Sequence, residues 1–191
     1  MLQRDHCGAV PCPDLRFHAD SRQGRLRPYV YVCRADYANP HHAKVLVALL
    51  DAYAQDPMGG GEPLSDFAQK NLIACLAARP QAFSVLAFEA ADEQRPLGLI
   101  NCIEGFSTFA CKPLVNVHDV VVLPSYRGQR VAERMFALVH AIAQERGACK
   151  LTLEVLSGNV VALRLYTRLG FVQYQLDPAA GSAQFLQKWL D

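Results

Sequence analysis

The sequence lacks any apolar run long enough to cross a bilayer, although 51% of its 191 residues are hydrophobic. A membrane-spanning helix needs about 20 predominantly apolar residues in a row. The sequence also has little net charge, with a formal value of +1 at pH 7. A domain that binds nucleic acid normally gathers basic residues on one face. We therefore expect neither a membrane nor a nucleic acid among the partners of this protein.

Disulfide and metal frameworks are missing as well. The seven cysteines are odd in number and widely scattered, whereas a disulfide-stabilised secreted domain usually has an even set. The first residues do not have the form of a signal peptide, so we expect a reducing, cytoplasmic location. His6, Cys7, Cys12 and His18 match no familiar zinc spacing, and no metal site is predicted.

Residues 1–28 differ in composition from the rest of the chain. They are rich in Arg, Asp, Pro and Gly and have no sustained hydrophobic period, which is typical of a segment that packs poorly. We predict a poorly ordered N-terminal extension over residues 1–28. A single domain is predicted over residues 29–191, a length that can bury a core.

Strand and helix patterns alternate after residue 28. Runs of β-branched and aromatic residues predict strands, and apolar residues at helical spacing predict helices. The predicted strands cover residues 29–34, 83–90, 97–106, 113–124, 149–156, 171–176 and 183–190. The predicted helices cover residues 40–54, 64–78, 129–146 and 159–169. This order predicts an α/β fold with a mixed sheet and helices on its faces.

The segment SYRGQRVAERM, residues 125–135, joins an apolar strand to the long helix. A helix start exposes unpaired N–H groups and the positive end of the helix dipole, so it attracts anions. Gly128 lets the backbone approach a ligand closely, and Arg127 and Arg130 add positive charge. The sequence therefore predicts an anion site here. A P-loop is excluded, because no G-K-[S/T] follows the turn.

Residues 118–174 resemble the acetyl-CoA-binding half of the GNAT acyltransferase superfamily. The matching pieces are HDVVVLP, YRGQRVA, a long helix, LTLEV and GNVVALRLYTRLGF, in this order. The resemblance implies a mostly antiparallel central sheet, flanked by helices and splayed at the cofactor site. It also implies an N-acetyltransferase that uses acetyl-CoA as co-substrate and transfers the acetyl group directly to a primary amine.

The resemblance also implies which residues bind the cofactor. The pyrophosphate of coenzyme A would lie on backbone N–H groups at the helix start. These belong to Arg127, Gly128, Gln129, Arg130, Val131 and Ala132. The pantetheine arm would pair, like an added strand, with the backbone of Val120, Val121 and Val122. Asn159 would bind the cofactor arm.

Arg130 departs from the family pattern, which has glycine at this position. A Cβ atom there restricts how closely the backbone and a phosphate approach each other, whereas a guanidinium group could itself reach a phosphate. The alternative is an arginine that faces solvent in the first helical turn, and the sequence leaves both open. The departure keeps a second function in view: a sensor or scaffold that binds acyl-CoA and catalyses little.

Three residues are candidates for catalysis. The resemblance implies that Tyr166 protonates the departing thiolate, although a tyrosine at helical spacing commonly packs in a core. Glu154 interrupts the apolar strand pattern, where a carboxylate is costly unless it is paired or chemically useful. A buried Glu154 would suit proton removal from the amine, and an ion-paired residue at a strand edge is the alternative. Asp119 is another candidate base, and its neighbour His118 would face the opposite way unless a bulge intervenes.

The acceptor site is predicted from CIEGFSTFACKP, residues 102–113. Glu104, Phe106 and Phe109 would place an acid between aromatic rings, which suits a cationic amine; a packed hairpin is the alternative. The acceptor could be a polyamine, an aminoglycoside, an amino acid, a peptide or a protein lysine. The oligomeric state, a homodimer included, is also left open.

Overall fold

The computed structural model describes residues 29–90, 92–175, 177, 179, 181 and 183–190, so the predicted extension over residues 1–28 lies outside the described residues. The described residues form one five-stranded sheet in sequential order. Its strands are β1 (Val30–Arg34), β2 (Ala82–Glu89), β3 (Asp92–Ser107), β4 (Lys112–Val122) and β5 (Leu151–Leu153). All neighbours pair antiparallel except β4 and β5, which are parallel. The predicted mixed, mostly antiparallel sheet is confirmed.

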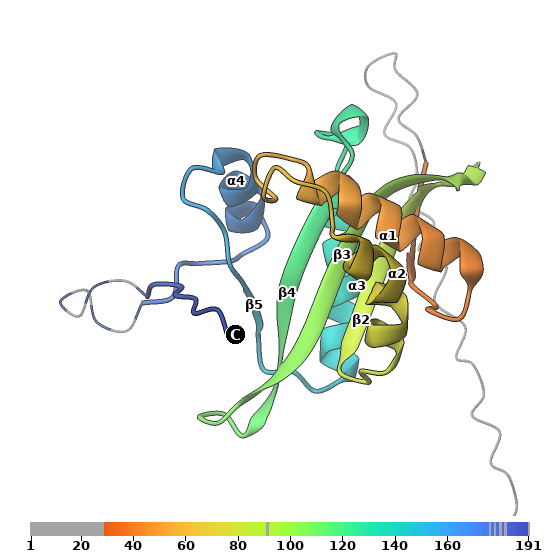
Figure 1. Ribbon diagram of the computed structural model, residues 1–191. Coiled ribbons are helices and arrows are strands. Elements are labelled where there is room, and N and C mark those ends of the chain that lie inside the picture. Colours follow the sequence, from red (N-terminus) through yellow and green to blue (C-terminus); the bar gives the residue numbers. More distant parts are fainter. Residues whose placement is uncertain are drawn as a thin grey trace, which may run out of the picture.

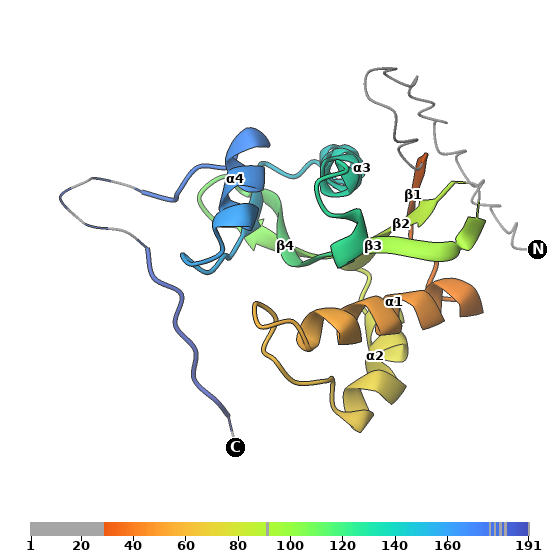
Figure 2. The same ribbon diagram turned by 90° about the horizontal axis from the view of Figure 1, so that it is seen from above.

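Helices cover both faces of the sheet (Figures 1 and 2). The helices α1 (Pro40–Ala54) and α2 (Asp66–Ala77) lie on one face, and α3 (Val131–Glu145) and α4 (Val160–Arg168) lie on the other. Asn39 caps α1 and Ser65 caps α2, each through a side-chain oxygen that accepts backbone N–H groups. Gly147 and Gly170, with φ of 70° and 89°, follow the last turns of α3 and α4. Among the described residues, no helix combines the length and apolarity that a bilayer span requires.

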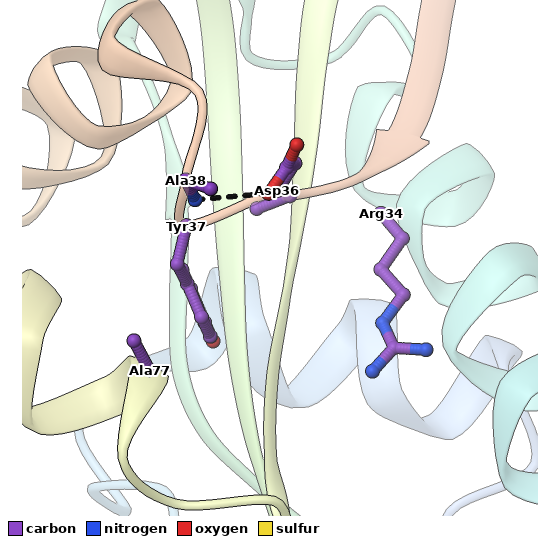
Figure 3. A pocket seen from close by; sticks show the side chains of 6 residues that line it. Arg34, Asp36, Tyr37, Ala38 and Ala77 are labelled. Carbon is purple, nitrogen blue, oxygen red and sulfur yellow. Dashed lines mark hydrogen bonds between the residues drawn. The ribbon is translucent and has the colours of Figure 1, made fainter. Parts of the chain in front are cut away.

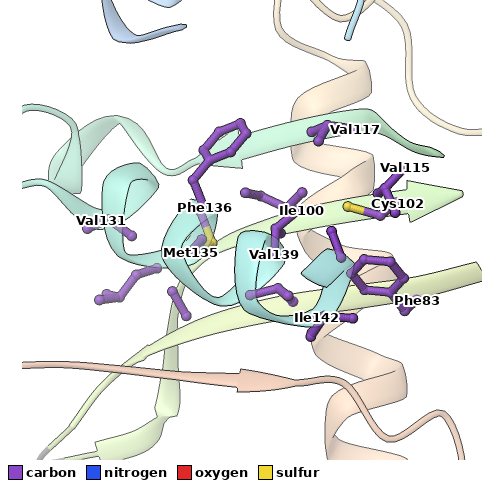
Figure 4. Close-up of a cluster of buried hydrophobic side chains, with 14 of the residues drawn as sticks. Phe83, Ile100, Cys102, Val115, Val117, Val131, Met135, Phe136, Val139 and Ile142 are labelled. Atoms are coloured by element: carbon purple, nitrogen blue, oxygen red, sulfur yellow. The ribbon is translucent and has the colours of Figure 1, made fainter. Parts of the chain in front are cut away.

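The two faces of the sheet bury separate apolar clusters. On one face, side chains of β2, β3 and β4 pack against Met135, Phe136 and Val139 of α3 (Figure 4). On the other face, Leu86 and Leu99 pack against α1 and α2. Because both faces are covered, a shift of one residue in any strand would exchange the two sets of side chains. Burial therefore fixes which side chains face which helix layer.

A β-bulge in β4 changes the alternation beside the predicted site. Asn101 of β3 pairs with Asp119, but the next residue, Cys102, pairs with Val117. His118 is thus the extra residue in β4. Val117 faces the α3 cluster, so Asn116 before the bulge and Asp119 after it both project from the α1–α2 face. Two polar side chains that lie three residues apart in sequence consequently share one face.

The sheet opens between β4 and β5. These strands pair only over residues 115–117 and 151–153, whereas β4 continues to Val122. From His118 onward, the edge of β4 that faces β5 has no strand partner among the described residues. Figure 1 shows the two segments diverging toward α4. The predicted strand over residues 149–156 is therefore shorter in the structure, and the opening lies directly before the turn that leads into α3.

Two C-terminal strands predicted from the sequence do not form. Residues 171–175 and 183–190 contain no strand, and the apolar side chains of Phe185 and Trp189 are 76% and 84% exposed. Strand propensity depends on packing against a neighbouring strand, and these residues lie on no sheet edge. The connection between the predicted strands 83–90 and 97–106 is also shorter, because β3 already begins at Asp92 and pairs with β2 through register shifts near Phe88.

Candidate active site

The turn before α3 presents backbone N–H groups that none of the described side chains caps. A short 3₁₀ helix, Pro124–Tyr126, follows β4, and Gly128 then adopts a φ of 75°. Arg130 is the N-cap of α3 and has φ 61° and ψ 24°, with no capping side chain on the first helical turn. The predicted start of the helix at Gln129 is wrong by two residues, because Arg130 lies in the left-handed region. The exposed helix start is the anion-attracting feature that the sequence predicts.

Arg130 keeps the backbone conformation of a glycine. For an L-residue, the left-handed region costs roughly 1–2 kcal/mol. We expect Arg130→Gly to be more stable than Arg130→Ala by about 1 kcal/mol, because both variants lose the guanidinium group but only glycine relieves the strain. Urea denaturation of the two variants measures the difference. Equal stabilities would contradict a strained position.

Arg127 is bound within the protein through its side chain. Its Nε donates to the carbonyl oxygen of Val122 at 3.1 Å, and its Nη2 donates to Asp56 Oδ2 at 3.0 Å. The pKa of the Asp56 carboxyl is lowered, first by the N–H group of Met58 and then by Arg127. Arg127 thus ties the turn before α3 to the loop after α1. The carbonyl group of Val122, one of the three predicted pantetheine partners, is already bonded.

Asn159 and Gln129, two predicted cofactor residues, each have one of their two polar amide atoms hydrogen-bonded within the fold. Asn159 Oδ1 accepts from the N–H group of Ala162 at 3.1 Å and caps α4, while its Nδ2 makes no hydrogen bond to the described residues. Gln129 Nε2 donates to the carbonyl oxygen of Ser125 at 3.0 Å. Its Oε1 is buried and accepts nothing from the described residues. A buried unpaired acceptor is unusual, so both amides retain a group that a ligand could satisfy.

The ring of Tyr166 is packed in the core. It lies edge-on to Phe136 at 5.9 Å and to Phe171 at 5.8 Å between ring centroids, and only 9% of the residue is exposed. Burial, and to a smaller extent the Tyr53 phenol, raises the pKa of Tyr166 to about 12. The hydroxyl group therefore keeps its proton at neutral pH, and it makes no hydrogen bond within the described part of the chain. Tyr166 therefore packs in the core through its ring and also keeps a hydroxyl proton that it could donate.

Asp119, Tyr53 and Tyr166 form an electrostatic cluster, in which Asp119 acts on Tyr53 and Tyr53 acts on Tyr166. Asn101 Nδ2 donates to Asp119 Oδ2 at 2.9 Å. The pKa of Tyr53 is raised, first by burial and then by the negative charge of Asp119. The negative charge of Asp119 of β4 thus acts on Tyr53 of α1, and Tyr53 acts on Tyr166 of α4, although no hydrogen bond or ring contact joins these three described side chains. Sequence reasoning missed Tyr53, because a tyrosine at the end of an amphipathic helix has no feature that separates it from a core residue.

Glu154 is exposed, so the prediction of a buried carboxylate is wrong. It follows the short strand β5, and its two carboxylate oxygens accept from Asn116 Nδ2 at 3.2 Å. The separation of β5 from β4 leaves the side chain in water. Because Asn116 projects from the α1–α2 face, Glu154 lies on the same face of the sheet as Asp119.

The predicted acceptor residues lie elsewhere. Glu104 accepts from Arg146 Nη1 at 2.9 Å, and the Arg146 guanidinium lies 4.8 Å from the centroid of the Phe83 ring. Phe83 belongs to the α3 cluster, so Glu104 faces away from Asp119. Phe106 and Phe109 are exposed where β3 turns into β4. The structure does not bring these three residues to the cluster around Tyr166.

Two hollows lie outside this cluster. One of about 480 Å³ is lined by Arg34, Ala35, Asp36, Tyr37, Ala38 and Ala77 (Figure 3). Another of about 410 Å³ is lined by Val160, Leu163, Arg164, Thr167 and Arg168 of α4. Across the described residues, no three His, Cys, Asp or Glu side chains come together in a way that could hold a metal ion.

The chain is similar in sequence and in fold to known proteins. The model of the acetyltransferase (GNAT) family matches residues 34–171. The chain is 28% identical over 137 residues to the N-alpha-acetyltransferase MAK3 of Arabidopsis thaliana, a match that covers 72% of this chain and 64% of that protein. The chain thus spans less than two thirds of the length of that relative.

Solved structures share the fold at low sequence identity. A probable acetyltransferase superposes with a TM-score of 0.70 at 20% identity, over 84% of this chain and 99% of that one. AAC(6')-Iy, in complex with the bisubstrate analogue CoA-S-monomethyl-acetylneamine, superposes with a TM-score of 0.65 at 16% identity, over 85% of this chain and 99% of that one.

Proposed function

Because the chain belongs to the GNAT acetyltransferase family, we propose that it transfers an acetyl group from acetyl-CoA directly to a primary amine. The proposal rests on the opening between β4 and β5, which begins at His118, and on the electrostatic link of Asp119 to Tyr53 and of Tyr53 to Tyr166. The cluster contains a carboxylate that can accept a proton and a phenol that holds one. A proton acceptor and a proton donor both accelerate direct transfer to an amine.

The residues around the cluster fit coenzyme A. The uncapped start of α3 offers N–H groups to the pyrophosphate at residues 128–132, whereas the N–H group of Arg127 already donates to the carbonyl oxygen of Pro124. The open edge of β4, from Val120 to Val122, offers backbone groups to the pantetheine amides, except the carbonyl group of Val122, which already accepts from Arg127. Asn159 Nδ2 is a further donor. The solved complex of AAC(6')-Iy with a CoA-based analogue supports this assignment by fold.

The reaction divides between two side chains. Asp119 takes one proton from the acceptor ammonium and releases it to solvent, so that the neutral amine nitrogen can bond to the thioester carbonyl carbon. As the carbon–sulfur bond breaks, Tyr166 gives its proton to the sulfur, the nitrogen loses its second proton to solvent, and Tyr166 regains a proton from solvent. Holding both reactants in one opening lowers the entropic cost of their encounter. Glu154 contributes negative charge on the acceptor face, while Glu104, Phe106 and Phe109 take no part.

A second function, an acyl-CoA-binding sensor or scaffold, is favoured by one observation. Arg130 holds a strained left-handed conformation where the family has glycine. If the side chain narrowed the pyrophosphate site, the protein would bind acyl-CoA without efficient turnover. Steady-state release of CoA with a panel of amines separates the two functions, because only the enzyme turns over repeatedly. The panel should include peptides with a free α-amino group and aminoglycosides, which the names of the similar proteins indicate.

Acetyl-CoA is expected to stabilise the folded protein. A ligand that binds only the folded state adds about 2.7 kcal/mol when its free concentration is 100 times Kd. Thermal unfolding with increasing acetyl-CoA measures the shift in Tm, and dephospho-CoA controls for binding through the ribose phosphate. A Tm that does not change with either acetyl-CoA or CoA would rule out the cofactor assignment.

A further inference from the structure

A row of polar side chains crosses the buried α1–α2 face of the sheet. Ser84 of β2 pairs in register with Asn101 of β3, which pairs with Asp119 of β4. Ser84 is fully buried and Asn101 is 6% exposed. Their neighbours along the strands on this face, Leu86 and Leu99, are apolar and buried. Burying polar groups here is costly unless each is hydrogen-bonded.

The row forms one continuous chain of hydrogen bonds. Asn101 Nδ2 lies 2.9 Å from Asp119 Oδ2, and Ser84 Oγ lies 2.6 Å from Asn101 Oδ1. The Tyr37 hydroxyl lies 2.9 Å from Ser84 Oγ. Tyr37 follows β1 and lines the hollow of about 480 Å³. The chain therefore runs across three strands, from that hollow to the candidate base.

Chemistry fixes the direction of each bond. A carboxylate only accepts, so the amide nitrogen of Asn101 must face Asp119 and its oxygen must face Ser84. The amide oxygen cannot donate, so Ser84 donates its single hydroxyl hydrogen to it. Tyr37 must then donate to Ser84. Every donor thus points toward Asp119, and hydrogen bonds aligned in this way strengthen one another.

We propose that Asn101, Ser84 and Tyr37 are positioning residues that hold Asp119 Oδ2 in place and leave Oδ1 for the acceptor amine. Asp119 Oδ1 makes no hydrogen bond to any residue that the structure describes. An amide does not readily pass a proton along, so the chain acts through orientation and charge and not as a proton relay. This inference rests on the proposed function, in which Asp119 is the base.

The test compares variants that cut the chain with one that removes a buried hydroxyl elsewhere. Ser84→Ala should lower kcat about tenfold and leave the KM for acetyl-CoA unchanged, since a displaced catalytic group can cost up to about 10²-fold. Tyr37→Phe, which keeps the ring, should lower kcat by a smaller factor. Ser107→Ala is the matched control, because Ser107 is also buried but lies outside the chain. Equal kcat values for all three variants would overturn the proposal.

A double-mutant cycle separates positioning from a general loss of stability. Adding Ser84→Ala to Asp119→Asn should not lower kcat further, because the group that Ser84 positions is already gone. Independent, multiplicative losses would overturn the proposal. If Asp119→Asn alone keeps the wild-type kcat, the proposed base is wrong, and that failure is distinct from failure of the chain.

NMR of the Asn101 side-chain amide tests the chain without activity. Its NH₂ resonances should move in Ser84→Ala, Tyr37→Phe and Asp119→Asn, and should stay in place in Ser107→Ala. Unchanged resonances in the three chain variants would show that the bonds are not coupled and would overturn the proposal. Resonances that move without any change in kcat would make the chain purely structural, which overturns the positioning role.

Discussion

Tyr166→Phe is expected to lower kcat for acetyl transfer by about 10²–10⁴-fold, the usual contribution of a general acid. The substitution removes one hydroxyl group and keeps the ring that packs against Phe136 and Phe171. Affinity for acetyl-CoA should therefore change little. Single-turnover kinetics isolate the chemical step, and isothermal titration gives Kd. Tyr126→Phe is the matched control, because Tyr126 packs against the same apolar cluster.

The raised pKa of Tyr166 gives this prediction a pH signature. Burial raises the pKa of the hydroxyl from 10.0 to about 12, so the folded protein favours the protonated form. The resulting stabilisation is fully present below pH 10 and is lost as the pH rises toward 12. The wild-type kcat should accordingly show no loss from ionisation of Tyr166 at pH 9. If Tyr166→Phe has the wild-type kcat, Tyr166 contributes only to core packing and not to catalysis.

Asp119→Asn is expected to lower kcat at neutral pH by about 10²–10⁴-fold, because asparagine keeps the shape but cannot accept the proton. Part of the activity should return at high pH, where the acceptor amine is already deprotonated. Glu154→Gln is the matched comparison, since it also neutralises a carboxylate on the same face. Its effect should be much smaller, because Glu154 is exposed to water. The pH dependence of kcat and kcat/KM for both variants measures the contrast.

Two results would contradict this assignment of the base. If Glu154→Gln loses activity while Asp119→Asn retains it, the two carboxylates exchange roles. If the best acceptor is neutral or anionic, negative charge on the acceptor face does not explain recognition. Acetyl-CoA affinity should stay the same in both variants, because neither residue belongs to the helix start that faces the pyrophosphate.

Local sequence signals predicted much of the fold. The helix over residues 40–54 has the bounds of α1, because Asn39 caps its first N–H groups and Pro40 suits the first helical position. The two strands predicted at the C-terminus do not form, because strand formation depends on a neighbouring strand and not on local signals alone. Residues 183–190 have strand-like composition, but a strand exists only when an edge pairs with it, and composition contains no information about a partner.

The β-bulge at His118 determines which face of the sheet Asp119 projects from, and the sequence does not predict where this bulge lies. The extra residue His118 shifts the alternation of β4, so Asn116, Asp119 and Glu154 share a face while Glu104 lies on the other. Nothing in the residue types announces a bulge. The left-handed conformation of Arg130 was equally hidden, because an arginine gives no signal for it; only the glycine of the family pattern hints at it.

The ion pair between Arg127 and Asp56 would connect the two proposed ligand sites energetically. It joins the turn that would face the pyrophosphate to the loop after α1, and α1 contributes Tyr53 to the acceptor side of the cluster. When two binding sites are coupled, the effect is reciprocal: each ligand changes the affinity for the other by the same factor. An acceptor amine that tightened the loop would raise the affinity for acetyl-CoA, and acetyl-CoA would then raise the affinity for the amine equally.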